Sequence, residues 1–424
     1  MKNLLLIILS TLLIMGAAKA DTIAITNGII HTITDAGVIT GGTVIIRDDK
    51  IAAVGKNIAI PDNARVIDAK GRVVTPGFMD AYGYMGLVEV SSVKGSVDAA
   101  VDGDHFTAAF NVAPAINPRS TLIPINRIEG ITRAVSAPWA GEGKSLIAGQ
   151  GVVIHLGSVE DYIVKNPAAM FAVLGESGAA IAGGSRAAAL LKLREAFLDA
   201  RDFADNKADF MQRERREYSL NWLDLQALQP VLAGELPLVV SVDRASDIVQ
   251  ALKLADEFNL QLIIAGGAEA WMVRDKLAAA RVPVILNPLQ NLPSSFETLG
   301  STLQNAAALH AAGVKIAFST GGSHNARNIK QGAGNAVAYG LPWRAALKAL
   351  TINPAQMFGI ANQYGRLAPG MDADVVIWSG DPLEVTSFAD AVFIKGRQIP
   401  MESRQTRLLE RYLDLDDAPR QSYD

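Results

Sequence analysis

The sequence contains no cysteine and only five histidines, His31, His105, His155, His310 and His324. The lack of cysteine excludes disulfides, thiolate metal sites and a lipidated cysteine anchor. Charge is also sparse, since 19% of the 424 residues are charged, against about 25% in typical globular chains. A net charge of -4 suggests no basic surface for nucleic acid. We therefore expect a small-molecule ligand or substrate and no nucleic-acid partner.

Long apolar runs are absent beyond the first twenty residues. Lys2 precedes the apolar stretch from Leu4 to Met15, and Ala18-Lys19-Ala20 forms a small-x-small cleavage site, the pattern of a secretory signal peptide. The apolar stretch is shorter than the roughly 20 residues that span a bilayer. We predict cleavage after Ala20, export to the periplasm, and no membrane span in the mature chain.

Both ends of the chain have short strand patterns. Residues 21–72 contain Thr22-Ile-Ala-Ile-Thr and Gly42-Thr-Val-Ile-Ile-Arg47, and residues 365–400 contain Ala373-Asp-Val-Val-Ile-Trp378. Strands this short do not bury both faces alone. We predict that the two ends form one small β-sandwich domain, followed by a charged, partly helical tail over residues 401–424.

Between the two ends, apolar strands alternate with helical stretches, which is typical of a parallel α/β architecture. A closed (β/α)8 TIM barrel over residues 73–364 requires eight strands, and a doubly wound open sheet is the alternative. Eight candidate strands are present: Val73–Met79, Gly130–Ser136, Gly151–Leu156, Phe171–Leu174, Leu236–Val242, Gln261–Ala265, Val282–Asn287 and Val314–Ser319.

Several motifs carry a family resemblance over nearly the whole mature chain. The stretch Thr75-Pro-Gly-Phe-Met-Asp-Ala-Tyr-Gly-Tyr84 resembles the Pro-Gly-φ-φ-Asp-x-His-x-His signature of the amidohydrolase superfamily. Gly365-Arg-Leu-Ala-Pro-Gly-Met-Asp-Ala-Asp374 and Gly380-Asp-Pro-Leu383 match the same family. Exported bacterial proteins similar to imidazolonepropionase are the nearest subgroup. The resemblance implies hydrolysis of non-peptide carbon–nitrogen bonds with zinc or another divalent metal.

The metal-ligand positions that this resemblance implies are degenerate. Tyr82 and Tyr84 replace two histidines of the first strand, and Ser241 and Asp243 stand in the histidine positions of the fifth. Gly266 replaces the histidine of the sixth strand, and Gly321 replaces the catalytic aspartate of the eighth. Lowering the pKa of a bound water requires several converging nitrogen and carboxylate ligands. We therefore expect no cofactor, and Tyr82, Tyr84 and Ser241 at the rim of a substrate pocket.

Four other residues are candidate catalytic groups. Glu176 and Asp243 are predicted at carboxyl ends of strands, where they would bind Mg²⁺ or Ca²⁺, perform acid–base chemistry, or pair with neighbouring cations. His324 follows the eighth strand, and His155 lies on the third. His324 would contact a ligand or act as a relocated base, and His155 would line the pocket or pack in the core.

Two functional interpretations remain open at this stage. In the first, the chain is an amidohydrolase with an impaired or altered site. In the second, it is a non-catalytic periplasmic binding protein or a structural partner of an active amidohydrolase. The second interpretation includes a homo-oligomer or pairing with an intact relative.

Overall fold

In the computed structural model, the described residues are 21–103, 105–139, 145–212 and 214–413. The predicted signal peptide, residues 1–20, lies outside them, as does the end of the tail, residues 414–424. Within the described residues, no helix combines the length and the apolar character needed to cross a membrane.

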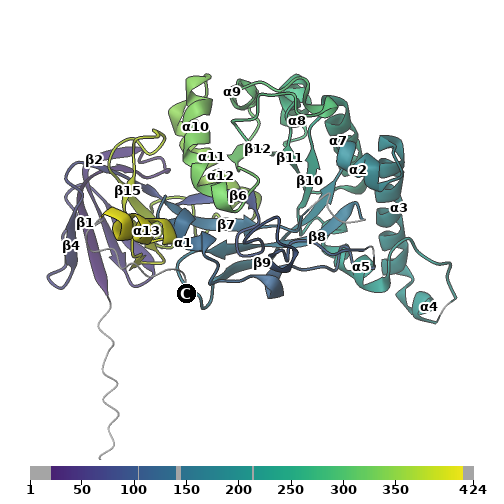
Figure 1. The fold of residues 1–424 in the computed structure, drawn as a ribbon, viewed down its shortest axis with the longest axis horizontal. Helices are drawn as coiled ribbons and strands as arrows, with labels where there is room; N and C mark the ends of the chain where they lie inside the picture. Colours follow the sequence, from purple (N-terminus) through teal and green to yellow (C-terminus); the bar gives the residue numbers. More distant parts are fainter. Residues whose placement is uncertain (1–20, 104, 140–144, 213, 414–424) are drawn as a thin grey trace, which may run out of the picture.

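Both chain ends contribute strands to one sheet, and the purple and yellow segments accordingly lie together in Figure 1. The strand order is β16-β15-β14-β5-β1-β2-β3, with β4 paired to β1. The ladder joins all eight strands, so strands from both chain ends form one hydrogen-bonded sheet. Its strands are β1 (Thr22–His31), β2 (Val38–Arg47), β3 (Lys50–Gly55), β4 (Arg65–Asp68), β5 (Val73–Pro76), β14 (Val375–Trp378), β15 (Ala389–Ile394) and β16 (Arg397–Gln398).

The second sheet is a nearly closed barrel of eight strands in sequence order, which confirms the predicted fold class of a barrel with an added sheet domain. Continuous apolar runs such as Leu238-Val-Val240 form these strands, because their side chains are buried on both faces. The strands are β6 (Phe78–Gly83), β7 (Ile131–Ser136), β8 (Ile147–His155), β9 (Ile163–Val173), β10 (Leu238–Val242), β11 (Leu262–Gly266), β12 (Val284–Leu286) and β13 (Ile316–Phe318).

The prediction that all eight barrel strands run parallel is wrong for β8. This strand pairs antiparallel with both β7 and β9, while the other neighbouring pairs are parallel. The fourth strand begins at Ile163, not at Phe171 as predicted, so only a short turn follows His155. A parallel crossover needs about a dozen residues or more. The short turn therefore forms a hairpin.

The predicted first strand, Val73–Met79, is divided between the two sheets. Its first half is β5 in the terminal sheet, and the barrel strand β6 begins after Gly77. A Cβ on Gly77 would lie 2.2 Å from Thr132 Oγ1. Glycine is therefore needed where the chain passes closely over β7 between the two sheets.

Helices cover the outside of the barrel, with α7 to α10 along one edge and α3 at the end farthest from the terminal sheet (Figure 1). Phe197 of α3 packs against Phe258 of α7, with ring centroids 5.2 Å apart. The helices are α1 (Leu122–Arg127), α2 (Gly175–Ile181), α3 (Arg186–Asp205), α4 (Lys207–Met211), α5 (Trp222–Ala227), α6 (Gln229–Leu232), α7 (Ala245–Phe258), α8 (Arg274–Ala279), α9 (Asn305–Ala311), α10 (Ile329–Ala338), α11 (Trp343–Ala349), α12 (Ile352–Met357) and α13 (Arg404–Leu413).

Short 3-10 turns complete the fold. Two of them lie in the long loop between β6 and α1, which has no longer helix among its described residues. The others lie on the carboxyl side of barrel strands. They are η1 (Lys94–Ser96), η2 (Ala113–Ala115), η3 (Ala270–Val273), η4 (Phe296–Thr298) and η5 (His324–Asn328).

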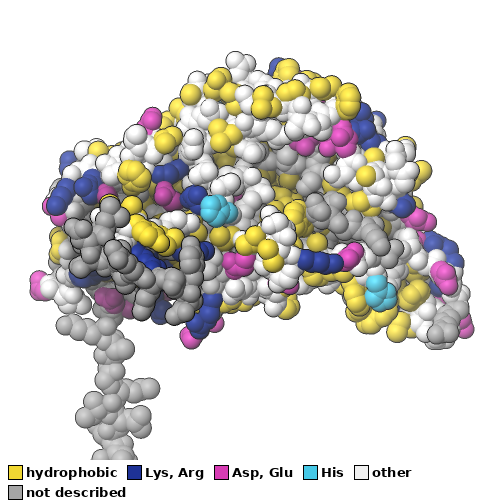
Figure 2. Space-filling model, in the orientation of Figure 1, with side chains coloured by type: hydrophobic (Ala, Val, Ile, Leu, Met, Phe, Trp, Pro, Cys, Tyr) yellow, Lys and Arg dark blue, Asp and Glu magenta, His cyan; other side chains and the backbone are white. Residues whose placement is uncertain are grey.

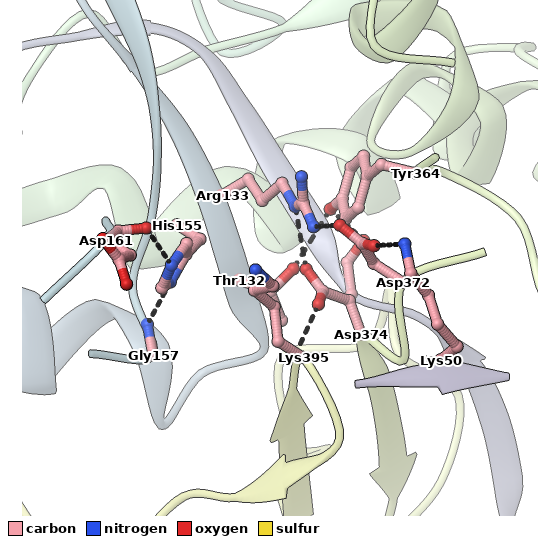
Figure 3. Close-up of polar contacts among 11 residues, drawn as sticks. Lys50, Thr132, Arg133, His155, Gly157, Asp161, Tyr364, Asp372, Asp374 and Lys395 are labelled. Atoms are coloured by element: carbon pink, nitrogen blue, oxygen red, sulfur yellow. Dashed lines mark hydrogen bonds and ion pairs between the residues drawn. The ribbon is translucent and has the colours of Figure 1, made fainter. Parts of the chain in front are cut away.

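A buried ionic network joins the barrel to the terminal sheet (Figure 3). Arg133 of β7 is 1% exposed; its Nε donates to Asp374 at 3.0 Å and its Nη2 donates to Asp372. Asp372 also accepts from Lys50 Nζ of β3 at 2.5 Å. The Arg133 guanidinium lies 4.4 Å from the ring centroid of Tyr364. This network fixes the junction on the side of the barrel where β7 begins.

Candidate functional site

A cavity of about 310 Å³ opens at the carboxyl ends of the barrel strands. This is the face on which barrels of this type carry their sites. Residues from β6, β9, β10, β11 and β12 and the loop after β13 line it. They are Tyr82, Val173, Leu174, Ser177, Ser241, Val242, Asp243, Ala265, Gly266, Ile285, Leu286, Asn287, Gln290, Glu297, Ser319, Thr320 and Gly321.

Asp243, at the end of β10, contributes one carboxylate to the cavity. Its Oδ1 accepts a hydrogen bond from the backbone N–H of Ala268 at 2.9 Å. Burial raises the pKa of Asp243, and the nearby charge of Glu269 raises it further, while the Ala268 hydrogen bond lowers it. Among the described residues no cation forms an ion pair with this carboxylate.

Glu297 of η4 contributes the second carboxylate, and it shares one arginine with two other carboxylates. Its Oε2 accepts from the backbone N–H of Glu176 at 2.6 Å and lies 3.5 Å from Arg186. Arg186 also pairs with Glu176 at 3.5 Å and with Asp247 at 2.8 Å. Burial raises the pKa of Glu297, and the charge of Asp243 raises it further. The two carboxylates are therefore close enough to interact electrostatically.

Hydroxyl groups connect the first, fifth and last barrel strands. The Tyr82 hydroxyl lies 3.4 Å from Ser241 Oγ. Ser319 Oγ donates to the backbone carbonyl of Tyr82 and accepts from the N–H of Gly321. Burial raises the pKa of Tyr82, so this side chain presents a neutral phenol. These contacts hold β6 and the end of β13 together where the barrel closes.

The structure brings five of the sequence-predicted positions to one cavity: Tyr82, Ser241, Asp243, Gly266 and Gly321. Tyr84 is half-buried beside it, with its ring centroid 6.0 Å from Tyr82 and 5.6 Å from Trp139. Convergence at the carboxyl ends of parallel strands explains why these positions meet.

Three predicted catalytic candidates do not line the cavity. Glu176 turns toward Arg186 instead. His324 is exposed in η5 and contacts Asn325 and Arg327. His155 lies at the opposite end of the barrel, because β8 is reversed and places it beside Arg133.

His155 has a structural role in its own hairpin (Figure 3). Its Nε2 bonds to the carbonyl of Asp161 at 2.8 Å, and its Nδ1 accepts from the N–H of Gly157 at 3.2 Å. Both ring nitrogens are therefore occupied in closing the turn between β8 and β9. Burial lowers the pKa of His155, which favours this neutral form.

Sequence reasoning missed Glu297, Asn287, Gln290 and Ser177. Asn287 directly follows β12, so its strand-end position was a usable signal. Glu297 lies in a loop well beyond the strand, and no sequence pattern placed it at the mouth.

The same loop leaves apolar side chains in water beside the cavity. Leu292, Phe296 and Leu299 are 72%, 83% and 63% exposed. Figure 2 shows hydrophobic side chains gathered along the edge that carries α8 and α9.

The predicted homo-oligomer and the predicted pairing with an intact relative stay predictions.

Comparison with known proteins identifies the superfamily. A model of the Amidohydrolase family matches residues 241–399. The amidohydrolase structure from Thermotoga maritima MSB8 is 29% identical, covers 89% of this chain and 99% of its own, and superposes with a TM-score of 0.80. The chain belongs to the amidohydrolase superfamily.

Two curated relatives of this amidohydrolase-superfamily chain match only in part of their own length. Amidohydrolase tasK of Hapsidospora irregularis is 24% identical over 369 residues, and the match spans 80% of this chain but 37% of tasK. Imidazolonepropionase of Symbiobacterium thermophilum is 39% identical over 80 residues, 18% of this chain and 19% of that protein. The chain therefore spans well under two thirds of either relative.

The side chains of this amidohydrolase-superfamily member do not fit the divalent metal that the superfamily usually uses. The described residues contain no group of three or more His, Asp or Glu side chains placed to hold a metal ion. Gly266 and Gly321 offer no side-chain donor, and a neutral phenol such as Tyr82 is a poor zinc ligand. A zinc site needs about four donors converging on one point. We therefore derive no reaction step through a metal.

Proposed function

We propose that the chain has lost the metal-assisted hydrolysis of its superfamily and uses the barrel mouth to bind a small polar molecule. The observation that carries this proposal is the cavity itself. The positions that the superfamily resemblance assigns to ligands face it as Tyr82, Ser241, Gly266 and Gly321. The cavity and its polar lining remain, while the side chains that would bind a water-activating metal are absent from these four positions.

Elemental analysis combined with a hydrolysis assay tests this proposal. We expect protein purified without chelator to contain no stoichiometric divalent metal and to release no product from a panel of amides, lactams and dipeptide-like compounds. A superfamily member with its histidines in place, prepared identically, is the positive control. Stoichiometric metal or measurable turnover would overturn the proposal.

Asp243 and Glu297 support a second candidate, a metal-independent acid–base hydrolysis. Burial raises the pKa of both carboxyls in one cavity, and proton transfer is most efficient when the pKa of the group lies near the working pH. This candidate predicts turnover by metal-free protein. Asp243→Asn and Glu297→Gln should each abolish that turnover, and activity in both variants would exclude it.

We also propose that the mature chain starts at Asp21 and works in the periplasm. The positive and apolar N-terminal segment and the Ala18-Lys19-Ala20 site support this. Strand β1 begins at Thr22, so cleavage after Ala20 leaves the first strand whole. Amino-terminal sequencing of protein from the periplasmic fraction tests it, and an intact Met1 would contradict it.

A further inference from the structure

The charge of the cavity at the barrel mouth is unbalanced. Among the described lining residues there are two carboxylates, Asp243 and Glu297, and no lysine, arginine or histidine. The remaining polar lining consists of hydroxyls and of the amides of Asn287 and Gln290. A cavity of about 310 Å³ is the size of a small-molecule site and is much larger than a metal ion needs.

Asp243 is the carboxylate of the cavity that has no cation beside it among the described residues. Arg186 lies 3.5 Å from Glu297 outside the cavity lining and shares its charge with Glu176 and Asp247. Asp243 has no ion pair within the described part of the chain, and only its Oδ1 accepts a hydrogen bond there, from Ala268. Asp243 lines the cavity, and its Oδ2 accepts no hydrogen bond from those residues. Asp243 is partly buried, and a partly desolvated negative charge is stabilised by a paired cation.

Gly266 keeps this carboxylate accessible. A Cβ at this position would lie 2.8 Å from Asp243 Oδ1 and 3.4 Å from Oδ2. The absence of a side chain thus leaves room on the cavity side of Asp243. The hydroxyls of Ser241, on β10 itself, and of Tyr82, on β6, supply further acceptor oxygens.

We propose that the cavity binds a small organic cation, a primary ammonium or guanidinium compound, whose charged group pairs with Asp243. Such groups carry only donors, which suits a lining rich in carboxylate, hydroxyl and amide oxygens. Glu297, which lies beside Arg186, contributes further acceptor oxygens. This inference rests on the proposed binding function and names its ligand class.

Calorimetric titration of the full mature protein tests the ligand class. The probes are putrescine and agmatine, with 1,4-butanediol as the neutral analogue and succinate as the anionic one. We expect the two cations to bind, with affinity that falls as ionic strength rises, and the two analogues not to bind. Binding of succinate or butanediol alone overturns the cation proposal and leaves the binding function standing, whereas hydrolysis or stoichiometric Mg²⁺ or Zn²⁺ overturns the binding function itself.

A variant pair tests the position of the charge. Asp243→Asn removes the charge but retains an oxygen for the Ala268 N–H, so its melting temperature should stay close to that of the native protein. We expect it to weaken putrescine binding by roughly tenfold or more. Asp256→Asn removes an exposed carboxylate from α7 and is the matched control, with unchanged affinity. Equal binding by a folded Asp243→Asn variant, or no binding of any probe by the native protein, overturns the proposal.

Discussion

Gly266 lies so close to Asp243 that any side chain at 266 would meet the carboxylate, with a Cβ 2.8 Å from Oδ1. Gly266 also has φ of +89°, in the region that favours glycine. The superfamily resemblance assigns a histidine to position 266. In this chain the backbone there favours glycine, and the Asp243 carboxylate occupies part of the volume that a side chain would need.

Gly266→Ala should lower the free energy of unfolding by about 2–3 kcal/mol. A left-handed backbone costs a non-glycine residue about 1–2 kcal/mol, and displacing Asp243 weakens its hydrogen bond from Ala268. Gly321→Ala is the matched control, because φ is +67° there and the new Cβ meets no atom within 4 Å. Urea denaturation should show the larger loss for Gly266→Ala, and equal losses would contradict the contact with Asp243.

Restoring the two histidines of the first strand should not restore a metal site. The double variant Tyr82→His and Tyr84→His still lacks side-chain donors at Gly266 and Gly321, and Ser241 remains a hydroxyl. Zinc requires about four converging donors. Calorimetric zinc titration should therefore give no stoichiometric high-affinity binding, and one tightly bound equivalent of zinc would show that the remaining side chains suffice.

Much of the fold was predictable from apolar runs, because buried strands leave a strong pattern. All eight barrel strands were found, but the direction of β8 was not. Strand direction depends on the length of the connection, and the start of β9 at Ile163 was masked by the polar residues at its beginning. The same error placed His155 on the wrong end of the barrel.

The cavity residues that lie at the carboxyl ends of barrel strands were predictable from the sequence. Ser241, Asp243 and Gly266 lie at such ends, and the barrel geometry brings them together. Glu297 was not predictable, because a loop carries it to the cavity and its position depends on contacts with Glu176 and Arg186. Such tertiary contacts leave no periodic signal in the sequence.

Asp80 should make stability depend on pH. Complete burial raises the pKa of Asp80 to about 7, and the Tyr82 N–H at 3.4 Å offsets only part of this. The native state therefore holds a proton that the unfolded chain releases near pH 4. The stabilisation that comes from the protonated Asp80 side chain is fully present below pH 4 and is lost as the pH rises toward 7.

Asp80→Asn should remove this dependence, since the amide does not titrate. Relative to the native protein, the variant should gain roughly 1 kcal/mol of unfolding free energy per pH unit between pH 4 and 7. Denaturation at pH 4.5, 5.5, 6.5 and 7.5 measures the difference, with Asp256→Asn as the control for losing one carboxylate. A constant difference across this range would mean that Asp80 is ionised throughout.

Removing Arg133, whose ion pairs link the barrel to the terminal sheet, should cost more unfolding free energy than removing Arg72, whose ion pair lies within the terminal sheet. Arg133→Met leaves Asp374 and Asp372 buried without their main cation, which typically costs about 3–5 kcal/mol. Arg72→Met is the matched control, because Arg72 pairs with Asp390 at 2.6 Å while 45% exposed, and exposed pairs contribute at most about 1 kcal/mol. Guanidinium denaturation of both variants measures the two losses. The junction does not depend on the buried network if Arg133→Met costs no more than Arg72→Met.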